Sequence, residues 1–162
     1  MRITRCQVNH IENPLGYQME KPVFSWVTED ARGKKQEAAR LRVWREGATE
    51  KALLDTGWTD LDSLGTAAEM ELLPRTRYGW KVSVRSDAGE EAESGPNWFE
   101  TGKMAEPWQG KWITCDKTEP RLPVFRREFS LTGNKVASAR LYICGLGLMR
   151  RKSTGNGWGR NI

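Results

Sequence analysis

The sequence predicts an all-β protein that begins with an antiparallel sandwich. Apolar residues recur two positions apart in segments 39–44 and 78–85, so each segment has one apolar and one polar face. Residues that favour turns separate such segments at positions 30–33, 47, 55–57, 87–89 and 95–96. Short strands divided by turns over about 100 residues are typical of a β-sandwich.

The first two strands are expected before these segments. Residues 3–9 alternate imperfectly between apolar and polar side chains, and the run ends in the loop Asn13-Pro14-Leu15-Gly16. Residues 23–27, Val-Phe-Ser-Trp-Val, form the second predicted strand because β-branched and aromatic residues favour strands.

Residues 73–78 indicate which kind of sandwich this is. Leu73 and Pro74 lead into a turn, and Tyr78 opens the strand that contains Trp80. This order is the sequence form of a tyrosine corner, in which the ring packs on the core and the hydroxyl bonds to upstream backbone. Trp26 is expected to face Tyr78 as a large core residue. We therefore predict a fibronectin-III/immunoglobulin-like sandwich over 1–102, with structural roles for Trp26, Tyr78 and Trp80; a sugar-stacking surface is the alternative role for these aromatic side chains.

A second, incomplete β-sandwich is expected after this domain. Residues 103–114 break the strand pattern and are predicted to form a linker or interface segment. Residues 115–148 hold two predicted strands, 124–131 and 137–144, with Gly133-Asn134 in the loop between them. Residues 149–162 form a basic, glycine-rich tail without periodicity.

The net charge of +5 does not predict nucleic-acid binding. The tail contributes four basic residues and no acid, whereas the other 148 residues hold 22 basic and 21 acidic side chains. No apolar run approaches the roughly 20 residues that span a bilayer, and the N-terminus lacks the apolar stretch of a signal peptide. We expect no nucleic-acid partner, no membrane partner and a cytoplasmic location.

The sequence offers no recognisable catalytic, metal or cofactor site. Cys6, Cys115 and Cys144 are far apart and form no CxxC pair, so they are interpreted as small apolar residues in a reducing compartment. His10, the single histidine, has no identifiable partner for acid–base catalysis. We predict no catalytic residue, no metal ligand and no cofactor.

Three tryptophans are candidate contact residues. Trp108 and Trp112 lie four positions apart in the predicted linker, and Trp98 precedes it. These side chains could stack on a sugar, or Trp108 and Trp112 could pack between the two domains. Both interpretations remain open from the sequence.

An ordered series of segments resembles the opening of bacterial α-L-rhamnosidases. No single segment is specific, but the series is. Its members are Asn13-Pro14-Leu15-Gly16, 22–26, 36–43, Leu54-Asp55-Thr56-Gly57, 73–82, Trp98-Phe99-Glu100-Thr101-Gly102, 108–113, Phe125-Arg126-Arg127-Glu128-Phe129, Ala139-Arg140-Leu141-Tyr142 and Gly145-Leu146-Gly147.

The resemblance implies a non-catalytic fragment of such an enzyme. In that family a fibronectin-III-like domain comes first, a β-sandwich follows, and the catalytic α/α barrel lies several hundred residues further on. These inverting glycoside hydrolases cleave terminal α-L-rhamnose with two carboxylates of the barrel, and no position of this chain matches them. A rhamnose-containing carbohydrate is the implied partner. The alternative is a stand-alone carbohydrate-binding or protein-interaction module, and an exposed β edge makes self-association plausible.

The tail departs from the family after Leu148. Family members continue there with a strand resembling YEAxING. Residues 149–159 can be encoded so that reading from the last base of codon 148 gives YEAEINGKRVG, with synonymous codons chosen for all residues except Met149 and Trp158. We hypothesise that a frameshift near residue 148 truncates the family sequence before the catalytic domain.

Overall fold

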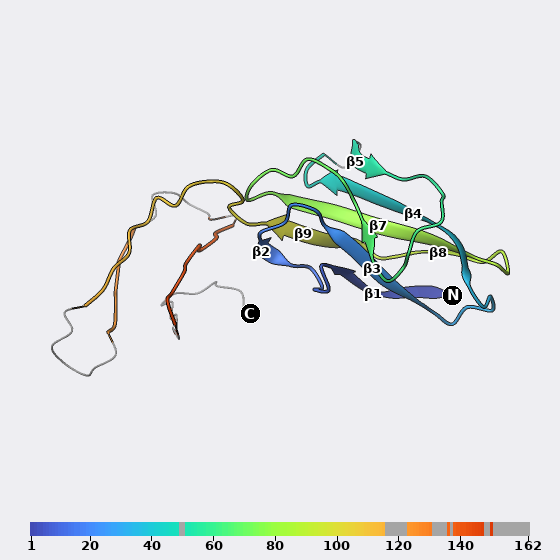
Figure 1. Ribbon diagram of the computed structural model, residues 1–162, viewed down its shortest axis with the longest axis horizontal. Coiled ribbons are helices and arrows are strands. Elements are labelled where there is room, and N and C mark those ends of the chain that lie inside the picture. The colour runs from blue at the N-terminus through green and yellow to red at the C-terminus, as the bar shows by residue number, and fades with distance from the viewer. Residues whose placement is uncertain (49–50, 116–122, 131–135, 137, 148–149, 151–162) are drawn as a thin grey trace. The chain divides into compact units, whose positions relative to one another are not determined.

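The computed structural model describes residues 1–48, 51–115, 123–130, 136, 138–147 and 150. The chain divides into two compact units, Met1–Trp112 and Ile113–Ile162, and each is treated by itself. Segment 103–112, which follows the last strand, therefore belongs to the first unit. The described residues form β-strands and no helix (Figure 1).

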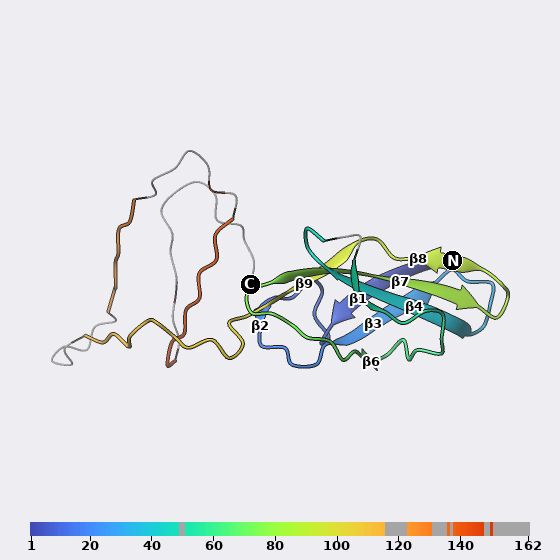
Figure 2. The ribbon, with the colours of Figure 1, turned by 90° about the horizontal axis from the view of Figure 1, so that it is seen from above.

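The first unit consists of two β-sheets. The smaller sheet has the order β1-β3-β6, formed by Arg2–Val8, Val23–Glu29 and Thr66–Ala67 (Figure 2). The larger sheet has the order β2-β9-β7-β4-β5, with β8 also paired to β7. Its strands are β2 Leu15–Tyr17, β4 Gln36–Arg45, β5 Ala52–Asp55, β7 Arg77–Ser86, β8 Glu91–Glu93 and β9 Asn97–Thr101. The predicted immunoglobulin-like all-β fold is confirmed.

Strands β4 and β7 form the longest ladder of the larger sheet. They pair antiparallel from Gln36↔Ser86 to Arg45↔Tyr78. Every second residue of β7, beginning at Tyr78, is buried, and the residues between them are half-buried on the other face. The alternation in segments 39–44 and 78–85 thus corresponds to a sheet with one face on the core.

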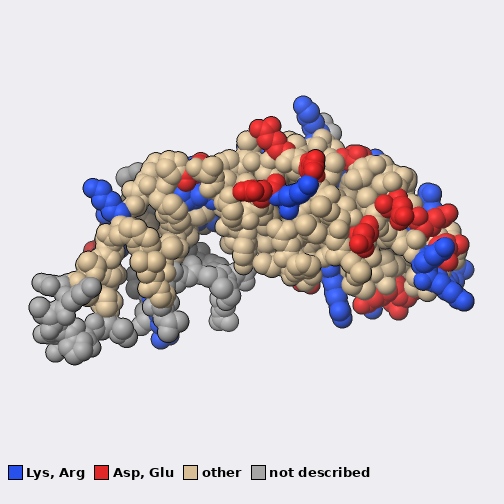
Figure 3. All heavy atoms as spheres, viewed as in Figure 1, with Lys and Arg blue, Asp and Glu red and all other residues tan. Residues whose placement is uncertain are grey.

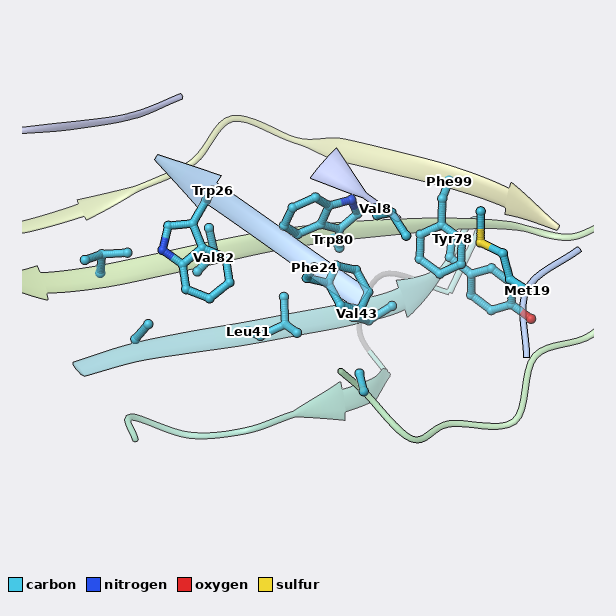
Figure 4. Packing of buried hydrophobic residues seen from close by; sticks show 13 residues of the cluster. Val8, Met19, Phe24, Trp26, Leu41, Val43, Tyr78, Trp80, Val82 and Phe99 are labelled. Atoms are coloured by element: carbon cyan, nitrogen blue, oxygen red, sulfur yellow. The ribbon is translucent and has the colours of Figure 1, made fainter. Parts of the chain in front are cut away.

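Aromatic rings fill the space between the two sheets (Figure 4). Phe24 of β3 packs edge-on against Trp80, with ring centroids 4.9 Å apart, and against Phe99 at 6.0 Å. Phe99 in turn stacks on Tyr78 at 5.1 Å. Phe24 therefore joins the smaller sheet to two strands of the larger one.

Trp26 does not face Tyr78, so that detail of the sequence prediction is wrong. The two side chains lie near opposite ends of the core in Figure 4. Trp26 is buried, and its indole Nε1 donates to Gln36 Oε1 at 3.0 Å. Phe99 occupies the place beside Tyr78 because the two residues are direct partners in the β7–β9 ladder.

Tyr78 forms the hydrogen bond that defines a tyrosine corner. The backbone N–H of Leu73 donates to the Tyr78 hydroxyl at 2.8 Å, and only 1% of Tyr78 is exposed. Arg75, at the turn between them, has a positive φ of 49°. This hydrogen bond holds the loop between β6 and β7 against the core.

Three segments differ from the sequence prediction. Residues 15–17, expected to begin in a loop, form the short strand β2, which pairs with β9 in parallel.

In the second unit, the described parts of segments 124–131 and 137–144 form no strand ladder. Large apolar side chains there are exposed, including Val124 at 91% and Phe129 at 69%. A strand forms only where neighbouring strands satisfy its backbone and cover its apolar face. Gly133, Asn134 and all of the tail except Arg150 lie outside the described residues.

Candidate functional site

The candidate site lies on the outer face of the six-stranded sheet, away from the core. Side chains along a strand point alternately to the two faces of a sheet. The residues between the buried ones in β4 and β7 therefore point to this outer face. Acidic and basic side chains are interspersed over the visible surface of the first unit (Figure 3). The outer face combines such charged residues with tryptophans.

Ion pairs cover the middle of this face. Arg40 Nη2 lies 2.5 Å from Asp55 Oδ2, and Arg40 Nε donates to Asp55 Oδ1 at 2.8 Å. Lys81 Nζ lies 2.7 Å from Glu93, which also pairs with Arg42. The hydrogen bond from Arg40 is the main cause that lowers the pKa of Asp55 to about 2. The hydrogen bond from Lys81 likewise lowers the pKa of Glu93.

The lowered pKa of Asp55 makes the sandwich sensitive to acid. A carboxyl whose pKa is lower in the folded state stabilises the fold above its unfolded pKa, near 3.8, and loses that contribution as the pH falls through about 2. An exposed pair contributes about 0.2–1 kcal/mol, so Asp55→Asn is expected to lower the melting temperature at pH 7 by a few degrees. Thermal unfolding should show this difference shrinking between pH 4 and pH 2. Asp60→Asn removes the same charge elsewhere and serves as control; an equal loss in both variants would contradict the assignment.

Two tryptophans flank a glycine at one end of the outer face. Trp44, Gly79 and Trp98 are in register across β4, β7 and β9. A Cβ atom on Gly79 would lie 2.6 Å from the Trp44 ring, so only glycine allows this ring to lie against the strand. Together with Glu46, Arg77, Pro96 and Asn97 these residues line a surface hollow of about 200 Å³, here named the Trp44–Trp98 hollow.

Arg77 fixes one side of the Trp44–Trp98 hollow. Its guanidinium carbon lies 4.1 Å from the centroid of the Trp98 ring, a cation–π distance. The guanidinium also lies 3.1 Å from Glu100 Oε2 and 3.9 Å from Glu46 Oε2. The single positive charge is therefore placed between two carboxylates.

A second hollow, of about 270 Å³, lies on the same sheet around Trp58. Arg85 covers the Trp58 ring with its guanidinium carbon 4.6 Å from the centroid, and Glu91 and Glu93 line the hollow. Trp58 is its single aromatic lining residue. As at the Trp44–Trp98 hollow, an arginine stacks on a tryptophan ring here. The lining of this second hollow, however, includes no second aromatic residue.

The structure separates the three tryptophans that the sequence singled out. Trp98 lines the Trp44–Trp98 hollow, whereas Trp108 and Trp112 follow β9 and are 57% and 70% exposed. Lys103 Nζ lies 5.5 Å from the Trp108 ring centroid. Sequence reasoning missed Trp44, although its place on the polar face of segment 39–44 was the signal available. Trp58 lies in the loop after β5, where no periodicity marks it.

The groups with potential for other chemistry are dispersed. Among the described residues, no three histidine, cysteine or acidic side chains gather as a metal site would require. Cys6 is half-buried, and burial raises the pKa of its thiol, while Cys115 and Cys144 are exposed and unbonded to one another. The described part of the chain also contains no helix long and apolar enough to cross a membrane.

Comparison with known proteins places these features in a family. Residues 3–105 match the family model described as Rha78A-like, N-terminal immunoglobulin domain. An α-L-rhamnosidase of Streptomyces avermitilis is 36% identical over 122 residues, which cover 71% of this chain and 12% of that protein. An α-L-rhamnosidase of Formosa agariphila is 29% identical over 177 residues, covering 86% of this chain and 18% of the relative.

Solved structures agree with the sequence relatives. The crystal structure of the Streptomyces avermitilis α-L-rhamnosidase complexed with L-rhamnose matches with a TM-score of 0.62 and 34% identity, over 71% of this chain and 12% of that one. The α-L-rhamnosidase from Dictyoglumus thermophilum matches with a TM-score of 0.60 and 32% identity, over 71% and 14%. The chain spans less than a fifth of the curated relatives that it matches. It belongs to the family of N-terminal immunoglobulin domains of α-L-rhamnosidases.

Proposed function

We propose that this chain is a non-catalytic N-terminal module of an α-L-rhamnosidase, an enzyme that hydrolyses terminal α-L-rhamnose residues. The observation that supports this most strongly is the match of residues 3–105 to a family model described as an N-terminal domain, together with relatives of which this chain covers less than a fifth. The module contributes a folded β-sandwich, and the hydrolytic chemistry belongs to the remainder of such an enzyme.

Four carboxyls of the first unit also favour a non-catalytic role. An inverting glycosidase needs a general acid with a raised pKa and a second carboxylate about 6.5–9.5 Å away. The carboxyls of Asp55, Glu69, Glu90 and Glu93 have lowered pKa values because each accepts hydrogen bonds from a cation or from backbone N–H groups. Carboxyls held in this way stay ionised at neutral pH and cannot donate a proton to a leaving group.

A hydrolysis assay tests the proposal. The full 162-residue chain is incubated with 4-nitrophenyl α-L-rhamnopyranoside, and release of nitrophenol is followed between pH 4 and pH 8. We expect no release above the rate without protein, because no position of this chain matches the catalytic carboxylates of the family and the carboxyls of Asp55, Glu69, Glu90 and Glu93 have lowered pKa values. The α-L-rhamnosidase of Streptomyces avermitilis serves as the positive control. Turnover that copurifies with the chain and disappears on a substitution within it would overturn the proposal.

A further inference from the structure

We propose that the Trp44–Trp98 hollow is a binding site for a neutral pyranose sugar. This goes beyond the proposed function, because a non-catalytic module needs no ligand site of its own. The proposal starts from the row Trp44–Gly79–Trp98, in which the Trp44 ring lies over Gly79 and Trp98 follows on the next strand. Small-ligand sites are lined mainly by apolar and aromatic side chains with a few polar groups.

The two rings suit the apolar face of a sugar. The face of an aromatic ring is electron-rich, so it attracts the slightly positive C–H groups that one side of a pyranose presents. The need to cover a glycine with a cross-strand aromatic residue accounts for Trp44, which lies against Gly79. This need does not account for Trp98, which lies on β9 at the other side of β7 and contacts Arg77.

Polar groups at the rim suit the hydroxyls of the sugar. Glu46 has a side chain that is 66% exposed, and its distance of 3.9 Å to Arg77 is longer than a hydrogen bond. Its carboxylate therefore keeps the capacity to accept hydrogen bonds from hydroxyl groups. The Asn97 amide is fixed in orientation because its Nδ2 donates to Gly95 O at 2.9 Å and to Ser94 Oγ at 3.2 Å.

The charge of the hollow favours a neutral ligand over an anion. Arg77 is its cation, and it lies between the carboxylates of Glu100 and Glu46. A phosphate or a nucleic-acid backbone would meet two acids beside one already paired base, which is unfavourable. A neutral, hydroxyl-rich ligand uses the exposed Glu46 carboxylate as a hydrogen-bond acceptor.

The test is an NMR titration of the full chain with sugars. Tryptophan indole N–H signals are recorded while L-rhamnose, methyl α-L-rhamnopyranoside, D-mannose or D-glucose is added. L-rhamnose is included because of the proposed function, whereas the site itself does not depend on that function. We expect the Trp44 and Trp98 signals, assigned with Trp→Phe variants, to move with a dissociation constant in the millimolar range for at least one sugar, as expected for a small ligand in a shallow site.

Matched variants decide which hollow binds. Trp98→Ala is expected to weaken binding at least tenfold, and Glu46→Gln, which keeps the shape of the side chain, about threefold or more. Trp58→Ala removes an arginine-covered tryptophan from the same sheet face and should leave binding unchanged. Near-ultraviolet circular dichroism checks that each variant is folded.

Three outcomes would overturn the proposal. The first is that no indole signal moves for any of the four sugars at about 100 mM, where a millimolar site is saturated. The second is that Trp58→Ala weakens binding as much as Trp98→Ala. The third is that the Trp44 and Trp98 signals move with protein concentration alone, which would identify a second copy of the chain as the occupant.

Discussion

Replacement of Phe24 by alanine is expected to lower the free energy of unfolding of the first unit by about 3–5 kcal/mol. Phe24 is fully buried and contacts Trp80 and Phe99 across the sandwich. Its loss removes apolar surface from the core and leaves a cavity between the two sheets. Because the free energy of unfolding of a single domain is only about 5–15 kcal/mol, this one change should remove a large part of it.

Urea unfolding followed by tryptophan fluorescence measures the effect. Val27→Ala is the matched control, because Val27 lies on the same strand and is 38% exposed. We expect the control to change the free energy of unfolding by less than about 1 kcal/mol. Similar losses in the two variants would show that the two sheets do not pack through Phe24.

Tyr78→Phe is expected to lower the free energy of unfolding by about 1–3 kcal/mol. The ring and its stacking on Phe99 remain, but the backbone N–H of Leu73 loses the hydroxyl that accepts its hydrogen bond. A part-buried donor without a partner costs its desolvation free energy, and this cost is the expected effect.

The control for this substitution removes the same oxygen from the surface. Tyr17 on β2 is 48% exposed, so Tyr17→Phe should change the free energy of unfolding by no more than about 0.5 kcal/mol. Amide exchange at Leu73 adds a local readout, since that amide should exchange faster in Tyr78→Phe. Unchanged exchange at Leu73 would contradict the tyrosine corner.

Local sequence patterns were sufficient for much of the first unit. The alternation in β4 and β7 identified their buried faces, because one face of each strand must be apolar. The series Leu73-Pro74…Tyr78 indicated the corner, because its hydrogen bond joins residues five apart in the chain. The partner of Tyr78 could not be found in this way. Phe99 reaches Tyr78 through the β7–β9 ladder, and pairing of strands distant in sequence is not marked by local periodicity.

The candidate site shows the same limit. Trp98 was recognised as a candidate, but Trp44 lies more than fifty positions earlier and meets it only through Gly79 of a third strand. A single glycine within an alternating strand indicates that another group lies close to the backbone there. The sequence alone does not identify which side chain this is. Self-association through an exposed strand edge stays a prediction.

A chimera tests whether this chain is the non-catalytic N-terminal module of an α-L-rhamnosidase, as proposed above. Residues 1–106, the segment that includes the family match, replace the matching segment of the Streptomyces avermitilis enzyme. Release of nitrophenol from 4-nitrophenyl α-L-rhamnopyranoside is then compared for the chimera, the parent enzyme and residues 1–106 alone. We expect a soluble chimera with activity within about tenfold of the parent and no activity in residues 1–106. Hydrolysis by residues 1–106 alone would contradict the proposal.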